Sequence, residues 1–305
     1  MPAPDRGTAL VTGGTGFTGH HLLPALAQAG YRTISLAKPG ETRADKLLHR
    51  VGDLLQQDFL EAVLADTAPD IIIHLAAISF AGHQDLGELY RTNILGTRAL
   101  LAAAAGAASR PRILLASSGG IYRPDSSRPL DEEAAIAPGN DYQLSKYAAE
   151  LLADQFRDRL AIRVVRPFNY TGVGQSDSFI IPKIVRAYRH RDSVIRLGNI
   201  DVERDFSDVR DVVAAYVGLC EAPGEDTVNI CSGDCTSPRA VLAGLARMTG
   251  HALEVEIDQR LVRHTDPPRL MGCNRRLRSL LPGWRPRPFR ETLAWMLEDE
   301  PLPAG

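Results

Sequence analysis

This chain of 305 residues has no long apolar run. Its most apolar stretch, residues 99–108, is rich in alanine and falls far short of the roughly 20 residues that cross a membrane. Residues 1–7 are few and polar, so we expect no signal peptide, no membrane association and a cytoplasmic location. The chain also has no large excess of charge of one sign, because 35 Lys and Arg and 37 Asp and Glu give a net charge of −2. We therefore expect no nucleic acid partner.

Cysteine is scarce as well, with four residues in the whole chain. Four cysteines do not make a disulfide framework at this length, and Cys231 and Cys235 lack a second pair at zinc-ligand spacing. We expect reduced structural thiols and no metal. The remaining composition, 44% hydrophobic and 24% charged residues, is typical of globular proteins and excludes a disordered, collagen-like or coiled-coil chain.

Short apolar runs alternate with longer helical patterns in the first half of the chain, which predicts βαβ units on a parallel sheet. Strands are expected at 9–12, 33–37, 71–75, 113–117 and 162–166, and helices at 17–29, 59–66, 88–108 and 142–159. Each helix is long enough to cross over between parallel strands. The pattern predicts an α/β fold with a Rossmann-type doubly wound parallel sheet. After residue 166, longer loops and frequent Pro and Arg predict a smaller C-terminal α/β cap.

A glycine-rich turn follows the first predicted strand. Gly13, Gly16 and Gly19 have the spacing Gly-x-x-Gly-x-x-Gly and open a helix at Phe17 and Thr18. Glycines there allow a tight turn and the close approach of a pyrophosphate, while the helix N-terminus supplies N–H donors and a positive dipole. Its place between a strand and a helix favours a dinucleotide site over an ordinary glycine turn.

Two further segments suit the same ligand. Asp53, followed by Leu54, would bring a carboxylate to an adenine amino group, with a turn cap as the competing interpretation. The strand that contains His74 ends in small residues that leave room for a cofactor, whereas His74 itself is expected to be structural. These residues at the strand end are Leu75, Ala76 and Ala77.

A serine at a strand end and a Tyr-x-x-x-Lys pair at a helix start form the strongest constellation. Tyr142 and Lys146 lie on one helix face, because residues four apart are neighbours there. A tyrosine of ordinary pKa near 10 is a poor acid–base catalyst, and we expect the nearby lysine ammonium to lower that pKa. Ser118 would hold the substrate oxygen. The glycine-rich turn in the same chain argues against an ordinary amphipathic helix.

Together these motifs resemble the extended short-chain dehydrogenase/reductases that act on nucleotide-diphospho-sugars, over essentially the whole chain. The resemblance implies that Tyr142 is the acid–base catalyst, Lys146 its partner and a ligand of the nicotinamide ribose, and Ser118 the oxygen-binding hydroxyl. Asn93 would shape the active-site helix. It would do so either as part of the cofactor site or in a purely architectural role. The cofactor residues implied are Gly13, Gly16, Phe17, Thr18, Gly19, Lys38, Asp53, Leu54, Leu75, Ala76, Ala77, Asn93, Tyr142, Lys146 and Pro167.

The resemblance also divides the chain. Residues 1–166, with returns near 205–232, are expected to form the NAD(P)-binding Rossmann domain. Residues 167–204 and 233–305 would form a sugar-nucleotide-binding cap, and the protein is expected to be a homodimer.

The absence of an acid pair after the active-site hydroxyl narrows the set of possible reactions. Sugar-nucleotide 4,6-dehydratases follow their active-site hydroxyl with an acid pair, and here Gly119 and Gly120 occupy those positions. With no base for the C5 proton, reduction or oxidation at C4 is favoured. A sugar-nucleotide 4-epimerase stays open, since it needs only the Ser/Tyr/Lys set, a retained NAD and a sugar that can rotate. A non-catalytic dinucleotide-sensing protein is disfavoured, because such proteins commonly lose the Tyr-x-x-x-Lys pair.

The second half resembles members of the family that bind GDP-sugars. Residues 166–175 resemble a segment that meets the diphosphate, and 197–200 with 204–206 resemble a guanine-and-phosphate wall, where Arg204 offers a planar fork. We therefore expect an NAD(P)H-dependent 4-ketoreductase of a GDP-4-dehydro-6-deoxy-hexose that forms GDP-D-rhamnose; attack on the opposite face would give GDP-6-deoxy-D-talose. The implied substrate-binding residues are Ser79, Ser118, Gly119, Asn169, Gln175, Lys183, Leu197, Gly198, Asn199, Arg204 and Arg263.

The end of the second predicted strand bears on the cofactor. An NAD enzyme usually has an acidic residue there for the ribose 2′-hydroxyl, and this chain has none. Lys38, with Arg43 or Lys46 behind it, would instead neutralise a 2′-phosphate. We expect NADP(H) to be preferred, with NAD(H) as the alternative.

Overall fold

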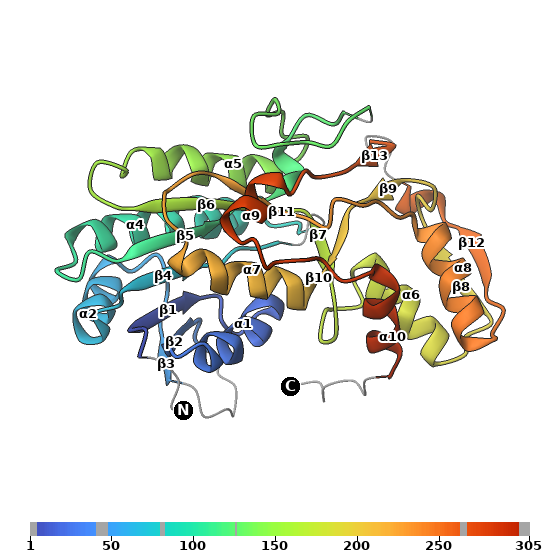
Figure 1. Cartoon of the computed structure of the whole chain (residues 1–305), viewed down its shortest axis with the longest axis horizontal. Helices are drawn as coiled ribbons and strands as arrows, with labels where there is room; N and C mark the ends of the chain where they lie inside the picture. Colours follow the sequence, from blue (N-terminus) through green and yellow to red (C-terminus); the bar gives the residue numbers. More distant parts are fainter. Residues whose placement is uncertain (1–4, 41–47, 80–82, 126, 263–266, 299–305) are drawn as a thin grey trace.

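The computed structural model describes residues 5–40, 48–79, 83–125, 127–262 and 267–298. Within them, seven parallel strands form one sheet in the order β11-β6-β5-β4-β1-β2-β3 (Figure 1). The strands are β1 (Thr8–Thr12), β2 (Arg32–Ala37), β3 (Leu48–Val51), β4 (Ile71–His74), β5 (Arg112–Ala116), β6 (Ile162–Pro167) and β11 (Val228–Ile230). The predicted doubly wound α/β fold is confirmed.

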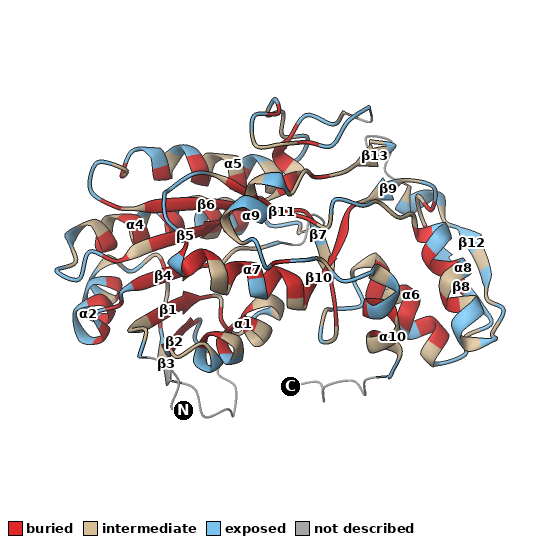
Figure 2. Cartoon of the chain, viewed as in Figure 1, coloured by how far each residue is buried: buried red, intermediate tan, exposed pale blue. Residues whose placement is uncertain are grey.

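Helices cover both faces of this sheet, because alternate strand residues point to opposite apolar clusters. Ala9 and Val11 of β1 pack in the cluster that contains residues of α1 and α7, and Leu10 packs in the cluster that contains residues of α2, α4 and α5. Figure 2 shows the resulting buried strands between helices whose outer sides are exposed. These helices are α1 (Phe17–Gln28), α2 (Gln57–Thr67), α4 (Thr97–Gly106), α5 (Asp141–Asp154) and α7 (Val209–Glu221).

Two predicted helices differ from the structure. The helix expected at 88–108 is a succession of α3 (Leu86–Tyr90), a π-helical turn η1 (Arg91–Gly96) and α4. In the π-helical turn the Asn93 side chain bonds the backbone of Ile78 in both directions, which ties this wider turn to the loop after β4. The helix expected at 142–159 ends at Asp154, because the following turn buries Phe156 in the core and lets Arg157 Nη1 donate to the Ile162 carbonyl.

The C-terminal half adds small parallel pairs and a third apolar cluster. The pairs join β7 (Asn169–Thr171) to β10 (Phe206–Asp208), β8 (Val194–Leu197) to β12 (Glu254–Ile257), and β9 (Glu203–Arg204) to β13 (Arg269–Leu270). The cluster lies among α6 (Ile180–Arg189), α8 (Pro238–Thr249) and α10 (Phe289–Glu298). A 3₁₀ turn η3 (Gln259–Leu261) and α9 (Arg275–Leu280) complete this half.

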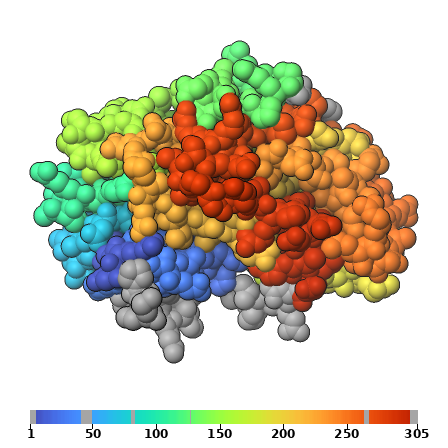
Figure 3. Space-filling view, in the orientation of Figure 1, coloured from blue at the N-terminus to red at the C-terminus, as the bar shows by residue number. Residues whose placement is uncertain are grey.

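The last part of the chain contacts both the large sheet and the C-terminal apolar cluster. The short helix α9 packs against β11 at the edge of the large sheet, and α10 packs against α6. Figure 3 shows these red segments on the surface between the N-terminal half and the orange helix α8. In the part of the chain that the structure describes, no helix has both the length and the apolar character needed to cross a membrane.

Candidate active site

A cleft of about 1580 Å³ opens at the carboxyl ends of the central strands. The residues that follow these strands line it: Gly13 after β1, Leu75 after β4 and Ser117 after β5, with Pro167 at the end of β6. Open parallel sheets bind ligands at this edge. On the other side, the cleft is lined by residues of the C-terminal half, from Asn169 to Leu270.

Most of the predicted site residues meet in this cleft. Gly19, Asn93 and Gly119 are not among the residues that line it, and Arg263 lies outside the described residues, as do Arg43 and Lys46. The predicted residues that line it are Gly13, Gly16, Phe17, Thr18, Lys38, Asp53, Leu54, Leu75, Ala76, Ala77, Ser79, Ser118, Tyr142, Lys146, Pro167, Asn169, Gln175, Lys183, Leu197, Gly198, Asn199 and Arg204.

The glycine turn fits a dinucleotide. Gly13 has φ +69°, and a Cβ there would come within 2.8 Å of the Ala76 backbone. A Cβ on Gly19 would lie 2.4 Å from the Gly14 backbone, so Gly19 is needed for the packing of α1 on the turn although it does not line the cleft. Among the described residues, no side chain caps the N-terminus of α1, whose N-cap is Gly16. Its first N–H groups are thus available to an anion at the cleft.

The start of α5 carries the Tyr-x-x-x-Lys pair into the cleft. Asn140 caps this helix, its side chain accepting a hydrogen bond from the Gln143 N–H at 2.9 Å. Tyr142 and Lys146 lie one turn apart, and both line the cleft. Ser118, at the end of the segment after β5, is hydrogen-bonded to the Tyr142 side chain. Serine, tyrosine and lysine thus come together as the spacing predicted; their catalytic roles stay predictions.

The electrostatics of this group differ from the expectation. Burial raises the pKa of Tyr142, and the hydrogen bond from Ser118 opposes this only in part. Lys146 is not among the groups that change the pKa of Tyr142, so the predicted lowering by its ammonium is wrong for this arrangement. Burial instead lowers the pKa of Lys146 to about 8, and the charge that acts on it is the Glu150 carboxylate, one turn further along α5.

Asn93 lies behind the cleft wall and holds two of its parts. Its Oδ1 accepts from the Ile78 N–H at 2.8 Å, and its Nδ2 donates to the Ile78 carbonyl at 3.1 Å and to Ser145 Oγ at 2.9 Å. Ser145 stands on α5 between Tyr142 and Lys146. Because the protein itself engages the whole amide, this geometry favours the architectural role over cofactor contact.

His74 is a buried structural histidine. Its two ring nitrogens pair with the hydroxyls of Thr12 at 2.6 Å and Thr97 at 2.9 Å. Burial and the Lys146 charge lower the pKa of His74 to about 3, so the ring is neutral at ordinary pH.

The two charged residues predicted for the adenosine side have protein partners. Asp53 lines the cleft, and its Oδ1 also accepts from the Leu55 N–H at 2.9 Å, as a turn cap does. Lys38 lines the cleft with its Nζ 3.7 Å from Glu88 Oε1. Glu88 also lies 3.2 Å from His83 Nε2. The sequence pattern did not predict that an acidic residue stands beside Lys38.

The predicted substrate wall comes from loops of the C-terminal half. Arg204 Nη1 donates to the carbonyls of Glu203 and Pro267, both at 2.8 Å, which fixes the guanidinium at the cleft. Lys183 Nζ donates to the Arg196 carbonyl at 2.7 Å. Gly198 is required by packing, since a Cβ there would lie 2.2 Å from the Leu261 carbonyl oxygen.

Tyr122, Tyr170 and Tyr216 line the cleft and were not predicted as site residues. The Tyr170 hydroxyl hydrogen-bonds Thr18 Oγ1 at 2.7 Å, and its ring stacks on Phe17 at 5.9 Å, so it joins the glycine turn to the strand after β6. Tyr216 of α7 is fully buried and also lines the cleft. Tyr170 lies inside the motif at 166–175, which offered a signal, whereas nothing around Tyr216 in the sequence distinguishes it from a core residue.

Comparison with known proteins identifies the family. The model of the NAD dependent epimerase/dehydratase family matches residues 9–231. The chain belongs to this family, which confirms the resemblance to extended short-chain dehydrogenase/reductases.

Individual relatives cover almost the whole chain. GDP-6-deoxy-D-talose 4-dehydrogenase of Aggregatibacter actinomycetemcomitans is 33% identical over 274 residues, 89% of this chain and 90% of the relative. GDP-6-deoxy-D-mannose reductase of Pseudomonas aeruginosa is 33% identical over 302 residues, 95% of each chain. The solved structure of RMD from Pseudomonas aeruginosa complexed with NADPH has a TM-score of 0.81 at 32% identity, over 95% of this chain and 97% of that chain. A candidate epimerase from Burkholderia cenocepacia J2315 has a TM-score of 0.90 at 45% identity, over 96% and 97%.

Proposed function

We propose that the protein is an NAD(P)H-dependent 4-ketoreductase of a GDP-4-dehydro-6-deoxy-hexose that forms GDP-D-rhamnose. The observation that carries this proposal is the meeting of Ser118, Tyr142 and Lys146 with the glycine turn in one cleft. The substrate class is supported by two relatives, both named for GDP-6-deoxyhexoses.

The two glycines after Ser118 argue against a dehydratase. A Cβ on Gly119 would lie 2.5 Å from the Phe168 ring, so this position has no room for an acidic side chain. A Cβ on Gly120 would lie 3.1 Å from the Gln143 amide nitrogen. Dehydration needs a base for the C5 proton, and neither position supplies one.

The side chains suit proton donation to the C4 oxygen. A nicotinamide dinucleotide, when bound, supplies the hydride that reduces this carbon. Tyr142 retains its proton at neutral pH because burial raises its pKa, and an acid for reduction must be protonated. Tyr142 would donate that proton to the oxygen as it gains negative charge, and Ser118 would hold the same oxygen by a hydrogen bond. The Lys146 ammonium would bind the ribose hydroxyls of the dinucleotide.

Charged residues suggest how the two nucleotides are held. Arg204 would bind the diphosphate of the GDP half, since a guanidinium matches phosphate oxygens with two parallel donors. Lys38 would pair with a 2′-phosphate, and we propose NADP(H) as the preferred cofactor. A relative's structure with NADPH supports this choice.

A second product is favoured by one relative's name. GDP-6-deoxy-D-talose and GDP-D-rhamnose differ only in configuration at C4, so the same residues would serve either, with the hexose turned over. A 4-epimerase would instead keep NAD bound through purification, whereas a reductase must exchange its cofactor in every turnover.

We also propose a homodimer. Leu95 of η1 and Leu144 and Leu151 of α5 expose about half of their surface, at 51%, 48% and 49%. Leu144 and Leu151 lie two turns apart on α5, which packs against η1, and these apolar side chains would be available to a second copy. Light scattering after gel filtration measures the mass directly.

The test of the function is substrate-dependent oxidation of NADPH. The purified protein should oxidise NADPH when offered GDP-4-dehydro-6-deoxy-D-mannose and do so far more slowly with the dTDP-linked 4-keto sugar. Equal rates would contradict the assignment of the base, and no oxidation with either sugar would contradict the reductase.

A further inference from the structure

A buried ion pair stands directly behind the lysine of the cleft. Arg166 of β6 donates through Nε to Glu150 Oε1 at 2.9 Å and through Nη2 to Oε2 at 2.6 Å, and both side chains are less than a tenth exposed. Glu150 lies on α5 one turn beyond Lys146. Neither Arg166 nor Glu150 is among the residues that line the cleft.

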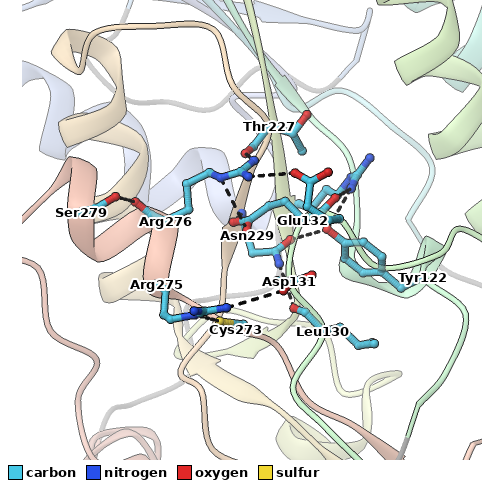
Figure 4. Close-up of polar contacts among 12 residues, drawn as sticks. Tyr122, Leu130, Asp131, Glu132, Thr227, Asn229, Cys273, Arg275, Arg276 and Ser279 are labelled. Carbon is cyan, nitrogen blue, oxygen red and sulfur yellow. Dashed lines mark hydrogen bonds and ion pairs between the residues drawn. The ribbon is translucent and has the colours of Figure 1, made fainter.

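The guanidinium of the pair is also held by a polar network, whose first member, Tyr122, lines the cleft. Arg166 Nη1 donates to the Tyr122 hydroxyl at 2.8 Å, and that hydroxyl donates to Asn229 Oδ1 at 2.8 Å. The Asn229 N–H in turn donates to Glu132 at 2.9 Å. Figure 4 shows Tyr122, Asn229 and Glu132 in this network. The guanidinium therefore cannot move away from Glu150 without breaking this network.

A buried ion pair is weak evidence of a purely stabilising role. Removing two charges from water costs free energy, and apolar residues of similar volume often replace a buried ion pair without loss. A charge placed four residues after Lys146 points instead to a role at that lysine.

The charges around Lys146 define this role. His74 of β4 faces it as a neutral ring, since burial lowers the pKa of His74 to about 3. Arg166 of β6 is a permanent cation whose charge is paired with Glu150. Burial lowers the pKa of Lys146 to about 8, and Glu150 opposes this effect. Without Glu150, no carboxylate would oppose the effect of burial on the Lys146 ammonium.

We propose that Glu150 is a positioning residue that keeps the Lys146 ammonium charged and holds α5 against β6 through Arg166. It acts through Lys146 and contacts neither cofactor nor substrate. The inference rests on the proposed role of Lys146 in binding the dinucleotide. It adds Glu150 to the site. This residue lies on the same helix as Lys146 and is held in place by Arg166 of β6, sixteen positions later in the chain.

The test separates the electrostatic effect from folding. Four variants are compared with the wild type: E150Q, E150Q/R166M, K146M and D154N. D154N is the matched control, because Asp154 is an exposed acid on the same helix that pairs with Arg157. Dissociation constants of NADPH are measured across neutral and alkaline pH by quenching of protein fluorescence, with thermal unfolding of each variant in parallel.

We expect the variants to differ in the pH at which NADPH binding is lost. Wild type and D154N should lose affinity as pH rises through about 8, where Lys146 loses its proton. In E150Q this loss should occur about one pH unit lower, which makes the affinity roughly threefold weaker midway between the two midpoints and about tenfold weaker above both. E150Q/R166M should regain thermal stability over E150Q, while its midpoint stays below the wild-type value. K146M should bind NADPH weakly, with no alkaline loss.

Two outcomes would overturn the inference. One is a folded E150Q or E150Q/R166M protein with the wild-type midpoint, which would leave the pair a purely structural role. The other is an alkaline loss of binding that persists in K146M. A protein that shows the expected shifts but reduces no GDP-linked sugar would contradict the proposed function and leave the role of Glu150 intact.

Discussion

Cofactor preference should depend on Glu88, the acid beside Lys38. An anion that accepts a hydrogen bond from Lys38 would stand about 6 Å from Glu88, which lies 3.7 Å from the ammonium. At that distance, in water, a doubly charged phosphate and a carboxylate repel by about 1.4 kcal/mol. Both side chains are about half exposed, and screening at physiological salt roughly halves this value to about 0.7 kcal/mol.

Replacing Glu88 by Gln should therefore raise the preference for NADPH over NADH about threefold. The assay is kcat/KM for the two cofactors at a fixed, saturating sugar concentration, repeated at low salt, where the change should grow. E256Q is a suitable control, because Glu256 is also exposed and paired with an arginine, Arg196, but does not line the cleft. An unchanged ratio in E88Q, or an equal change in E256Q, would refute the reasoning.

Three other predictions concern single residues. Tyr142→Phe should lower kcat by about two to four orders of magnitude and leave NADPH binding nearly intact, in stopped-flow and binding measurements; near wild-type turnover would remove Tyr142 as the acid. Arg204→Ala should raise KM about ten- to hundredfold with a smaller change in kcat, and GDP should compete better than dTDP; a constant KM would place the diphosphate elsewhere. His74 has a pKa lowered to about 3, so its neutral form stabilises the fold above pH 6.5, and this contribution is lost as pH falls. Between about pH 6 and 4 the unfolding free energy of the wild type should thus fall more steeply than that of His74→Asn, by about 1.4 kcal/mol per pH unit in denaturant titrations, and parallel slopes would contradict the burial of a neutral ring.

The parts of the molecule that were predictable are those with a local pattern. The first strand, the glycine turn and α1 follow one another in the sequence, and Tyr142 and Lys146 are one helical turn apart, so periodicity and spacing sufficed. The π-helical turn was not predictable, because the side chain that ties it to the fold, Asn93, exchanges a pair of hydrogen bonds with Ile78, fifteen residues away.

Charges brought together by the fold were also beyond reach. Lys38 and Glu88 lie fifty positions apart, and nothing near either residue indicates the other. The Thr18 and Tyr170 hydroxyls, which hydrogen-bond each other in the cleft wall, are 152 positions apart. The expected effect of Lys146 on Tyr142 failed for a similar reason, since burial of both groups depends on the packing of α5 and not on their spacing.

The most direct test of the central proposal is the fate of the hydride. The protein is incubated with GDP-4-dehydro-6-deoxy-D-mannose and NADPH that carries deuterium at the transferred position of the nicotinamide, and the product is examined by NMR. One deuterium should be found at C4 of a GDP-6-deoxyhexose, with the configuration of GDP-D-rhamnose, and Tyr142→Phe should form this product at a strongly reduced rate. Deuterium at another carbon, or a product without deuterium, would contradict reduction at C4 by this site.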